Sequence, residues 1–239
     1  MGSTPPIHSK KIHEGAAYPH WSEDAVWEMC LHLLSKDSPL PGKEQELQAF
    51  RDVFREVYRR LQDEHNHVKY KYFRGPDGRG IINPLYFDHY AILLYRFSRA
   101  LHLKGVDALL LDLLFFSIKS RCGMDLFYQV EIGDYFLPLH AHGAVLGRAR
   151  YGKYLVVMQY CTVGNNKETY PSFGDGVILR PGAMVLGNCH VGANVQVAAG
   201  ALVIDKDIPA NSIVFGRVPD LVIRENPQDN IAQYFDVIR

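Results

Sequence analysis

The strongest constraint on the fold of this chain is a six-residue period in its C-terminal half. Apolar side chains recur at every sixth position, and a small or β-branched residue comes four positions after each of the first five. The apolar positions are Phe173, Leu179, Val185, Val191, Val197 and Val203, and the smaller residues are Val177, Ala183, Cys189, Val195 and Ala201. An α-helix would spread such residues around its axis, and a hairpin sheet requires a period of two. Three short strands per turn of a solenoid do fit, so the period predicts a solenoid whose coils bury their apolar faces on one another.

The regular pattern sets the expected limits of this solenoid at residues 125–223. The polar stretch 164–172 interrupts the period, so we expect it to loop out between two strands. The last segment, 224–239, is expected to form a short helix and a tail.

The first half of the chain has a different pattern, because its apolar residues recur at helical spacing. This predicts a helical domain over residues 21–124, including one amphipathic helix from Glu44 to Leu61. Residues 1–20 lack an apolar core and are expected to be a flexible tail. The predicted fold class is therefore α+β, with a helical N-terminal domain followed by the solenoid.

Local signals mark the end of this helical domain. Asn83 followed by Pro84 is typical of an N-cap and a first helical position. We expect helices over residues 84–104 and 106–121, broken at Gly105.

Composition excludes several classes of function. Lys plus Arg and Asp plus Glu both number 26, so no basic surplus indicates a nucleic-acid or lipid surface. The most apolar run, 108–118, is too short to cross a bilayer and contains Asp112, so we expect a buried helix there. The four scattered cysteines have no CxxC spacing, which argues against disulfides and a metal site. A reducing cytoplasm is the expected compartment.

Four segments carry a resemblance to a known family. They are LYRFSRAL (94–101), IGDYFLPLHAHGAVLG (132–147), MQYCTVGN (158–165) and the stretch 176–219, which begins GVILRPGAMVLG. With the helical domain before them, these segments resemble the serine acetyltransferase family over about residues 90–223. The resemblance implies a left-handed parallel β-helix of hexapeptide repeats. It also implies an O-acetyltransferase that uses acetyl-CoA as co-substrate and needs no metal.

The same resemblance places a catalytic base at His140 and its carboxylate partner at Asp125. An alcohol attacks a thioester at neutral pH only if a base removes its proton, and histidine suits that role. A carboxylate on the second ring nitrogen would fix the tautomer and stabilise the imidazolium. A backbone N–H such as that of Gly164 would stabilise the oxyanion in a direct transfer. The alternatives are an ordinary structural histidine at 140 and an aspartate at 125 that only caps the first coil.

The expected cofactor contacts lie in the last coils. Lys206 and Arg217 are candidate cations for the phosphates of CoA, although they also suit an ordinary charged surface. The tight turns at Gly182 and at Ala199 and Gly200 are expected to present backbone amides to the pantetheine arm.

Departures from the family pattern bear on the acceptor. Leu139 stands where the family has an aspartate before the histidine, and Thr169 and Tyr170 replace an arginine-histidine pair that grips a carboxylate. Leu139, Tyr170 and His142 are therefore the expected acceptor contacts. A site without these charges suits an uncharged hydroxyl, so we expect a sugar or saccharide unit as the acceptor and L-serine as a poor one.

Other hypotheses remain open from the sequence alone. One is serine O-acetylation in cysteine biosynthesis, and another is a non-catalytic β-helix that has lost turnover. We expect the chain to assemble as a homotrimer, or as a pair of trimers, because related enzymes build their sites between solenoids.

Overall fold

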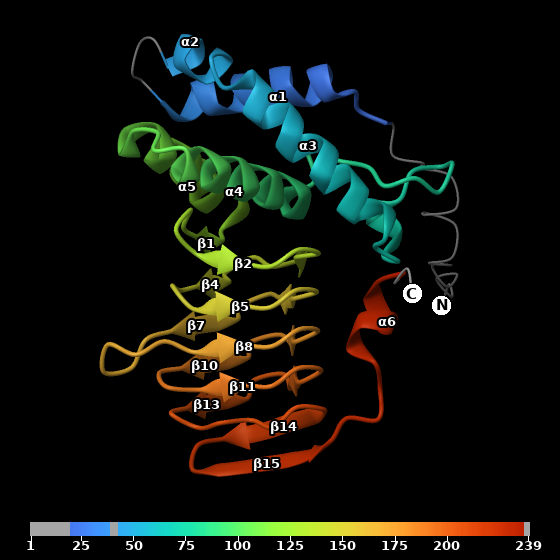
Figure 1. Cartoon of the computed structure of the whole chain (residues 1–239), viewed down its shortest axis with the longest axis vertical. Coiled ribbons are helices and arrows are strands. Elements are labelled where there is room, and N and C mark those ends of the chain that lie inside the picture. The colour runs from blue at the N-terminus through green and yellow to red at the C-terminus, as the bar shows by residue number, and fades with distance from the viewer. Residues whose placement is uncertain (1–19, 39–42, 237–239) are drawn as a thin grey trace, which may run out of the picture.

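The computed structural model describes residues 20–38 and 43–236. A layer of helices covers one end of a stack of short strands, and a C-terminal segment runs back along the stack towards the helices (Figure 1). The helical half and the parallel solenoid that the sequence predicts are both confirmed.

The helical layer contains five α-helices and one 3₁₀ turn within the described residues. They are α1 (Glu23–Asp37), α2 (Lys43–Gln48), α3 (Arg51–Asn66), a 3₁₀ turn (Lys71–Phe73), α4 (Phe87–Leu103) and α5 (Ala108–Cys122). The single helix expected over residues 44–61 is wrong, because the chain turns between α2 and α3. The amide of Phe50 bonds to the Leu47 carbonyl in an i–3 turn, which tightens the chain there.

The last two helices also differ from expectation at their ends. Helix α4 begins three residues after Pro84, because the Asn83 side chain accepts the Leu85 amide in a turn before the helix. The break at Gly105 is confirmed, and Asp107 caps the next helix through the Leu109 amide. The apolar run 108–118 was expected to form a buried helix, but helix α5 is only partly buried, since Leu109 is 52% exposed.

The solenoid consists of three parallel faces. The first face stacks β1 (Asp125–Leu126), β4 (Val145–Leu146), β7 (Thr162–Gly164), β10 (Met184–Leu186) and β13 (Leu202–Ile204). The second stacks β2 (Glu131–Ile132), β5 (Arg150–Tyr151), β8 (Ser172–Phe173) and β11 (His190–Val191). The third stacks β3 (Leu137–Leu139), β6 (Val156–Met158), β9 (Ile178–Leu179), β12 (Gln196–Val197) and β14 (Ser212–Arg217), and β15 (Asp220–Glu225) pairs antiparallel with β14.

The six-residue period corresponds to these faces. Phe173, Leu179 and Val185 lie on the second, third and first face in turn, and the next three members repeat that order. All six positions are at most 5% exposed, so each coil contributes one apolar side chain to each face of the core. The stretch 164–172 leaves the stack between β7 and β8 as expected (Figure 1).

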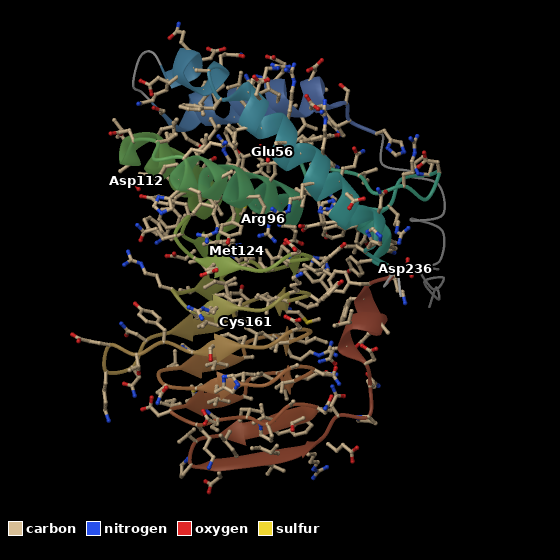
Figure 2. All side chains as sticks on the ribbon, viewed as in Figure 1. Glu56, Arg96, Asp112, Met124, Cys161 and Asp236 are labelled. Atoms are coloured by element: carbon tan, nitrogen blue, oxygen red, sulfur yellow. The ribbon has the colours of Figure 1, made fainter. Side chains whose placement is uncertain are left out.

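Polar contacts to backbone carbonyls join the helices to the first coil. Arg96 of α4 donates to the carbonyls of Ile132 and Gly133 at 2.8 and 2.6 Å, and the Tyr95 hydroxyl donates to Val130 at 2.8 Å. Figure 2 shows Arg96 and Met124 at this junction. The described part of the chain has no helix long and apolar enough to cross a bilayer.

The C-terminal segment is tied to the rest of the molecule. Helix α6 (Asn230–Tyr234) forms where a short helix is expected, and Asp229 caps it through the amides of Ile231 and Ala232. Beyond it, Phe235 pairs with Val68 at the end of α3. Of the tail expected over residues 1–20, residues 1–19 lie outside the described part of the chain, as do residues 237–239. The predicted domain limits, 21–124 and 125–223, stay a prediction.

Candidate active site

His140 lies at the corner between β3 and β4, directly after the third face of the first coil. Its backbone is in the left-handed region, with φ of 52°, and its side chain is exposed. Such a backbone costs a non-glycine residue about 1 kcal/mol or more, so surrounding contacts must hold it. The imidazole is therefore presented outwards from a fixed turn.

The contact that holds this turn comes from the helical half. Asp88, in the first turn of α4, is 8% exposed, and its two carboxylate oxygens accept the amides of His140 and Ala141 at 2.8 and 3.2 Å. Burial raises the pKa of Asp88, and these two amides act in the opposite direction. A carboxylate is thus present at the candidate base, although it comes from α4.

Aromatic side chains surround the same turn. The Tyr70 hydroxyl lies 3.2 Å from Nε2 of His140, and the two rings meet edge to face. The buried Tyr86 hydroxyl has no hydrogen bond of good geometry in the described chain. Burial, and secondarily the Asp88 charge, raises the pKa of Tyr86. Tyr70 therefore contacts the ring from the helical half, whereas Tyr86 lies beside Asp88.

Asp125 does not contact His140 in this structure. Its carboxylate forms an ion pair with Lys119 of α5 at 2.6 Å, and none of the described hydrogen bonds joins it to the imidazole. Asp125 instead lines a cavity of about 230 Å³ together with Val145, Arg148 and Tyr170. The carboxylate–imidazole pair expected from the sequence is therefore not formed in one protomer.

The three residues expected to contact the acceptor, His142, Tyr170 and Leu139, lie in different parts of the protomer. The His142 ring is exposed and lies over Gly123, where any Cβ would meet it at 2.4 Å. Tyr170 is 39% exposed in the loop after β7. Leu139 is only 4% exposed, because it packs in the core. The side chain of Leu139 is therefore shielded from solvent in one protomer, and its role as an acceptor contact stays a prediction.

Three of the expected cofactor residues share the corner occupied by His140. The strand register places Gly182 two coils below it, and Ala199 and Gly200 together on the coil after that. A Cβ on Gly200 would meet no atom within 4 Å, so the surface there is open. The amides of Gly182 and Gly200 already donate to carbonyls of the preceding coil, which leaves Ala199 as the turn's candidate donor. Arg217 pairs with Leu202 beside this column.

Gly164 and Lys206 lie elsewhere on the stack. Gly164 ends β7, and its register partners continue through Leu186 to Ile204, just before Lys206. Both residues therefore belong to the corner at the other end of the first face. One protomer does not bring Lys206 and Arg217 together as a pair.

Sequence reasoning missed Tyr70 and Asp88. Tyr70 contacts a residue 70 positions away, and Asp88 one that is 52 positions away, so no local pattern reports either contact. A signal for Asp88 does exist. It is a carboxylate at the start of the apolar run 88–95, on a helix that otherwise buries Tyr90, Ala91 and Ile92.

Comparisons with known proteins show what this chain is similar to in sequence and fold. The family model "Bacterial transferase hexapeptide (six repeats)" matches residues 170–205. "Serine acetyltransferase 2" of Arabidopsis thaliana is 32% identical over 164 residues, which cover 59% of this chain and 50% of the relative. The chain thus spans about half the length of this curated relative.

Solved structures extend the similarity to the helical half. Serine acetyltransferase of Neisseria gonorrhoeae has a TM-score of 0.67 and 26% identity, over 90% of this chain and 83% of that one. A second structure of that protein, in complex with serine, has a TM-score of 0.64 and 27% identity, over 84% and 83% of the two chains. Both structures carry the name serine acetyltransferase.

Proposed function

We propose that this chain is a member of the serine acetyltransferase family and an acetyl-CoA-dependent O-acetyltransferase. The observation that carries the proposal is the exposed His140 imidazole, held in a fixed turn at the head of the open corner formed by Gly182, Ala199 and Gly200. A base at one end of an extended surface column suits transfer between two substrates. The acetyl donor would lie along the column, with its thioester at the histidine.

His140 can serve as the only base of the reaction, because the proton that it removes is later returned. The imidazole removes the proton of the acceptor hydroxyl as its oxygen attacks the thioester carbon. The tetrahedral intermediate collapses by breaking the C–S bond, and the imidazolium returns its proton to the thiolate of CoA. The products are an O-acetyl ester and free CoA, with no acyl-enzyme. Gly164 lies on a different corner of the solenoid from His140. The backbone N–H of Ala199 is therefore better placed to donate a hydrogen bond to acetyl-CoA.

We propose L-serine as the first acceptor to test, because the relatives carry that name and one neighbour was solved with serine. One argument against L-serine was that Leu139 stands where the family has an aspartate. That argument is weaker in this structure, because the Leu139 side chain is buried in one protomer. An uncharged hydroxyl is the second candidate. The observation that favours it is the pair Thr169 and Tyr170 in the exposed loop, where neither side chain carries a positive charge for a carboxylate.

Two further features belong to this proposal. All four cysteines are buried free thiols, which suits a reducing compartment such as the cytoplasm. A homotrimer, or a pair of trimers, would bring the cavity at Asp125 and Tyr170 against a neighbouring solenoid. That assembly would place groups from two protomers at one site.

A thiol-release assay with acetyl-CoA tests the proposal. The acceptor panel contains L-serine, L-threonine, a hexose and a disaccharide, and the ester product is identified by mass spectrometry. We expect release of CoA that depends on L-serine, with formation of O-acetylserine. Release only with the sugars would favour the second candidate. A protein that binds acetyl-CoA without release in any mixture would contradict the transferase proposal and favour a non-catalytic β-helix.

A further inference from the structure

A cavity of about 490 Å³ lies where α3 and α4 meet the second face of the solenoid. Its apolar walls are formed by Val57 and Leu61 of α3, Ala100 of α4, Ile132 of β2 and Tyr151 of β5. It is larger than the 230 Å³ cavity beside the first face, and it lies away from the corner that carries His140. A cavity of this size can hold a small molecule.

Two buried charged side chains that line this cavity lack a full set of partners. Arg96 donates from its terminal nitrogens to two backbone carbonyls, but its Nε has no hydrogen-bond partner in the described chain. The Glu64 side chain is 7% exposed, and its Oε2 has no such partner either. The two groups approach to 3.8 Å, which is too long for a hydrogen bond. Buried charged atoms of this kind are unfavourable until a further group bonds to them.

A hydroxyl group satisfies both side chains at once, because it donates to a carboxylate oxygen and accepts from an N–H group. Glu56 of α3 and Glu131 of β2 also line the cavity (Figure 2 labels Glu56 and Arg96). Both carboxylates are exposed, and neither takes part in an ion pair within the described residues. Carboxylates accept hydrogen bonds from hydroxyls. The lining therefore suits a ligand with several hydroxyl groups.

Two cations of α4 add a requirement for negative charge. Arg99 and the exposed Lys104 line the cavity, and the ion pairs of the described chain include neither of them. Arg99 makes only long contacts, at 3.4 Å from one terminal nitrogen to two backbone carbonyls. Arg60 of α3, in contrast, is already paired with Asp134. Arg99 and Lys104 are thus available to a phosphate or a carboxylate.

We propose that this cavity binds a small hydroxylated anion, such as a sugar phosphate, at a site separate from the His140 corner. One hydroxyl of the ligand lies between Glu64 and Arg96 and completes their hydrogen bonds. The anionic group faces Arg99 and Lys104, and the apolar walls pack against the carbon skeleton. The ligand bridges the helical half and the solenoid, because α3, α4 and the second face all contribute to the cavity.

Calorimetric titration with glucose 6-phosphate tests this proposal. Gluconate is the carboxylate counterpart, and glucose and inorganic phosphate each carry only half of the chemistry. We expect a Kd for glucose 6-phosphate below about 1 mM, and about 10-fold or more below the Kd for glucose or phosphate alone. Binding of neither hydroxylated anion at about 10 mM, or equal binding of inorganic phosphate, would overturn the inference.

Two substitutions locate the ligand. Lys104→Glu reverses a charge at the cavity, and Lys36→Glu, exposed in the last turn of α1, is its matched control. Ala100→Met fills the cavity from α4 and should keep the parent melting temperature, because the longer side chain enters existing space.

We expect Lys104→Glu and Ala100→Met to weaken binding of glucose 6-phosphate about 10-fold or more, and Lys36→Glu to keep the parent Kd. Parent-like binding in both test variants would place the ligand elsewhere and overturn the inference. Lys104 is exposed, so its substitution remains informative even if Ala100→Met fails to fold. None of these measurements requires turnover, so their outcome is independent of the proposed acetyl transfer.

Discussion

His140, in the solenoid, combines an exposed imidazole with a strained backbone, and this combination distinguishes it from two buried histidines of the helical half. His65 and His89 are buried, and burial lowers the pKa of His65 to about 4 and that of His89 in the same direction. A buried neutral ring adds to packing, whereas an exposed ring held at a fixed corner is available to a substrate. His140 is therefore expected to affect turnover, and His65 to affect stability.

Replacing His140 by alanine should remove turnover and spare binding of the donor. We expect kcat to fall by about 10²–10⁴, because the base acts in the transition state. The Kd for acetyl-CoA should stay within about twofold, since the imidazole contacts the acceptor. Steady-state kinetics and calorimetry check both values, with His32→Ala on the exposed side of α1 as the control. A variant that keeps near-parent activity would contradict the role of His140.

The buried His65 should make the free energy of unfolding fall at acid pH. Its folded pKa of about 4 lies below the ordinary histidine value of 6.5, so the unfolded chain binds more protons between these pH values. Its contribution is fully present above pH 6.5 and is lost as the pH falls towards 4. The full loss amounts to about 3 kcal/mol. Urea unfolding across this range should show a flatter pH dependence for His65→Gln, whose amide can still donate to the Ile81 carbonyl. An unchanged slope would contradict the assignment.

At the residue scale, sequence was informative where a motif is local and uninformative where a contact joins distant segments. His140 was identified because its neighbours in the chain carry the resemblance. Asp88 was missed because its partners lie 52 and 53 positions away. The burial of Leu139 could not be predicted, because an apolar residue next to His140 suits a pocket as well as the core.

At the scale of elements, the C-terminal segment depends on one buried asparagine. Asn230, 1% exposed, begins α6 and donates to the carbonyls of Gly176 and Val195 at 2.9 and 3.2 Å. Its side-chain oxygen accepts from Gln196 and Asn226. The network fastens a short helix, which would not be stable alone, to the third and fourth coils.

Asn230→Ala should therefore cost about 2–4 kcal/mol of the free energy of unfolding, because several buried polar groups lose their partners at once. Chemical denaturation measures the loss, and Asn188→Ala on an exposed turn is the control. Limited proteolysis should then cut first in the C-terminal segment. A loss below 0.5 kcal/mol, roughly the effect of a surface change, would contradict the role of the network.

Elements with a long-range repeat were predicted better than those set by local caps. The six-residue period identified every face of the later coils, because each position is constrained by stacking on its neighbours. The break between α2 and α3 was missed, because Leu47 and Phe54 keep the same buried face across it. The start of α4 was placed early, because the Asn83 turn and a true N-cap use the same residue type.

At the scale of the whole molecule, the first face of the solenoid leaves apolar surface uncovered. Val145, Thr162, Met184 and Leu202 follow one another along its outer side, so three of the four side chains are apolar, and their strand neighbours point into the core. Val145 is 40% exposed beside the 230 Å³ cavity that contains Asp125 and Tyr170. Apolar columns beside candidate site residues are typical of subunit interfaces.

This surface predicts a threefold assembly of 27.1 kDa chains in solution. A trimer would cover the column of each protomer with a neighbouring solenoid, and a pair of trimers would double that mass. Val145→Glu should shift the mass measured by light scattering at micromolar concentration towards the monomer, because it places a charge in the apolar contact. Val222→Glu, 46% exposed on β15 at the far end of the stack, is the matched control and should keep the parent mass. A parent protein that is monomeric under these conditions would contradict both the assembly and a site shared between protomers.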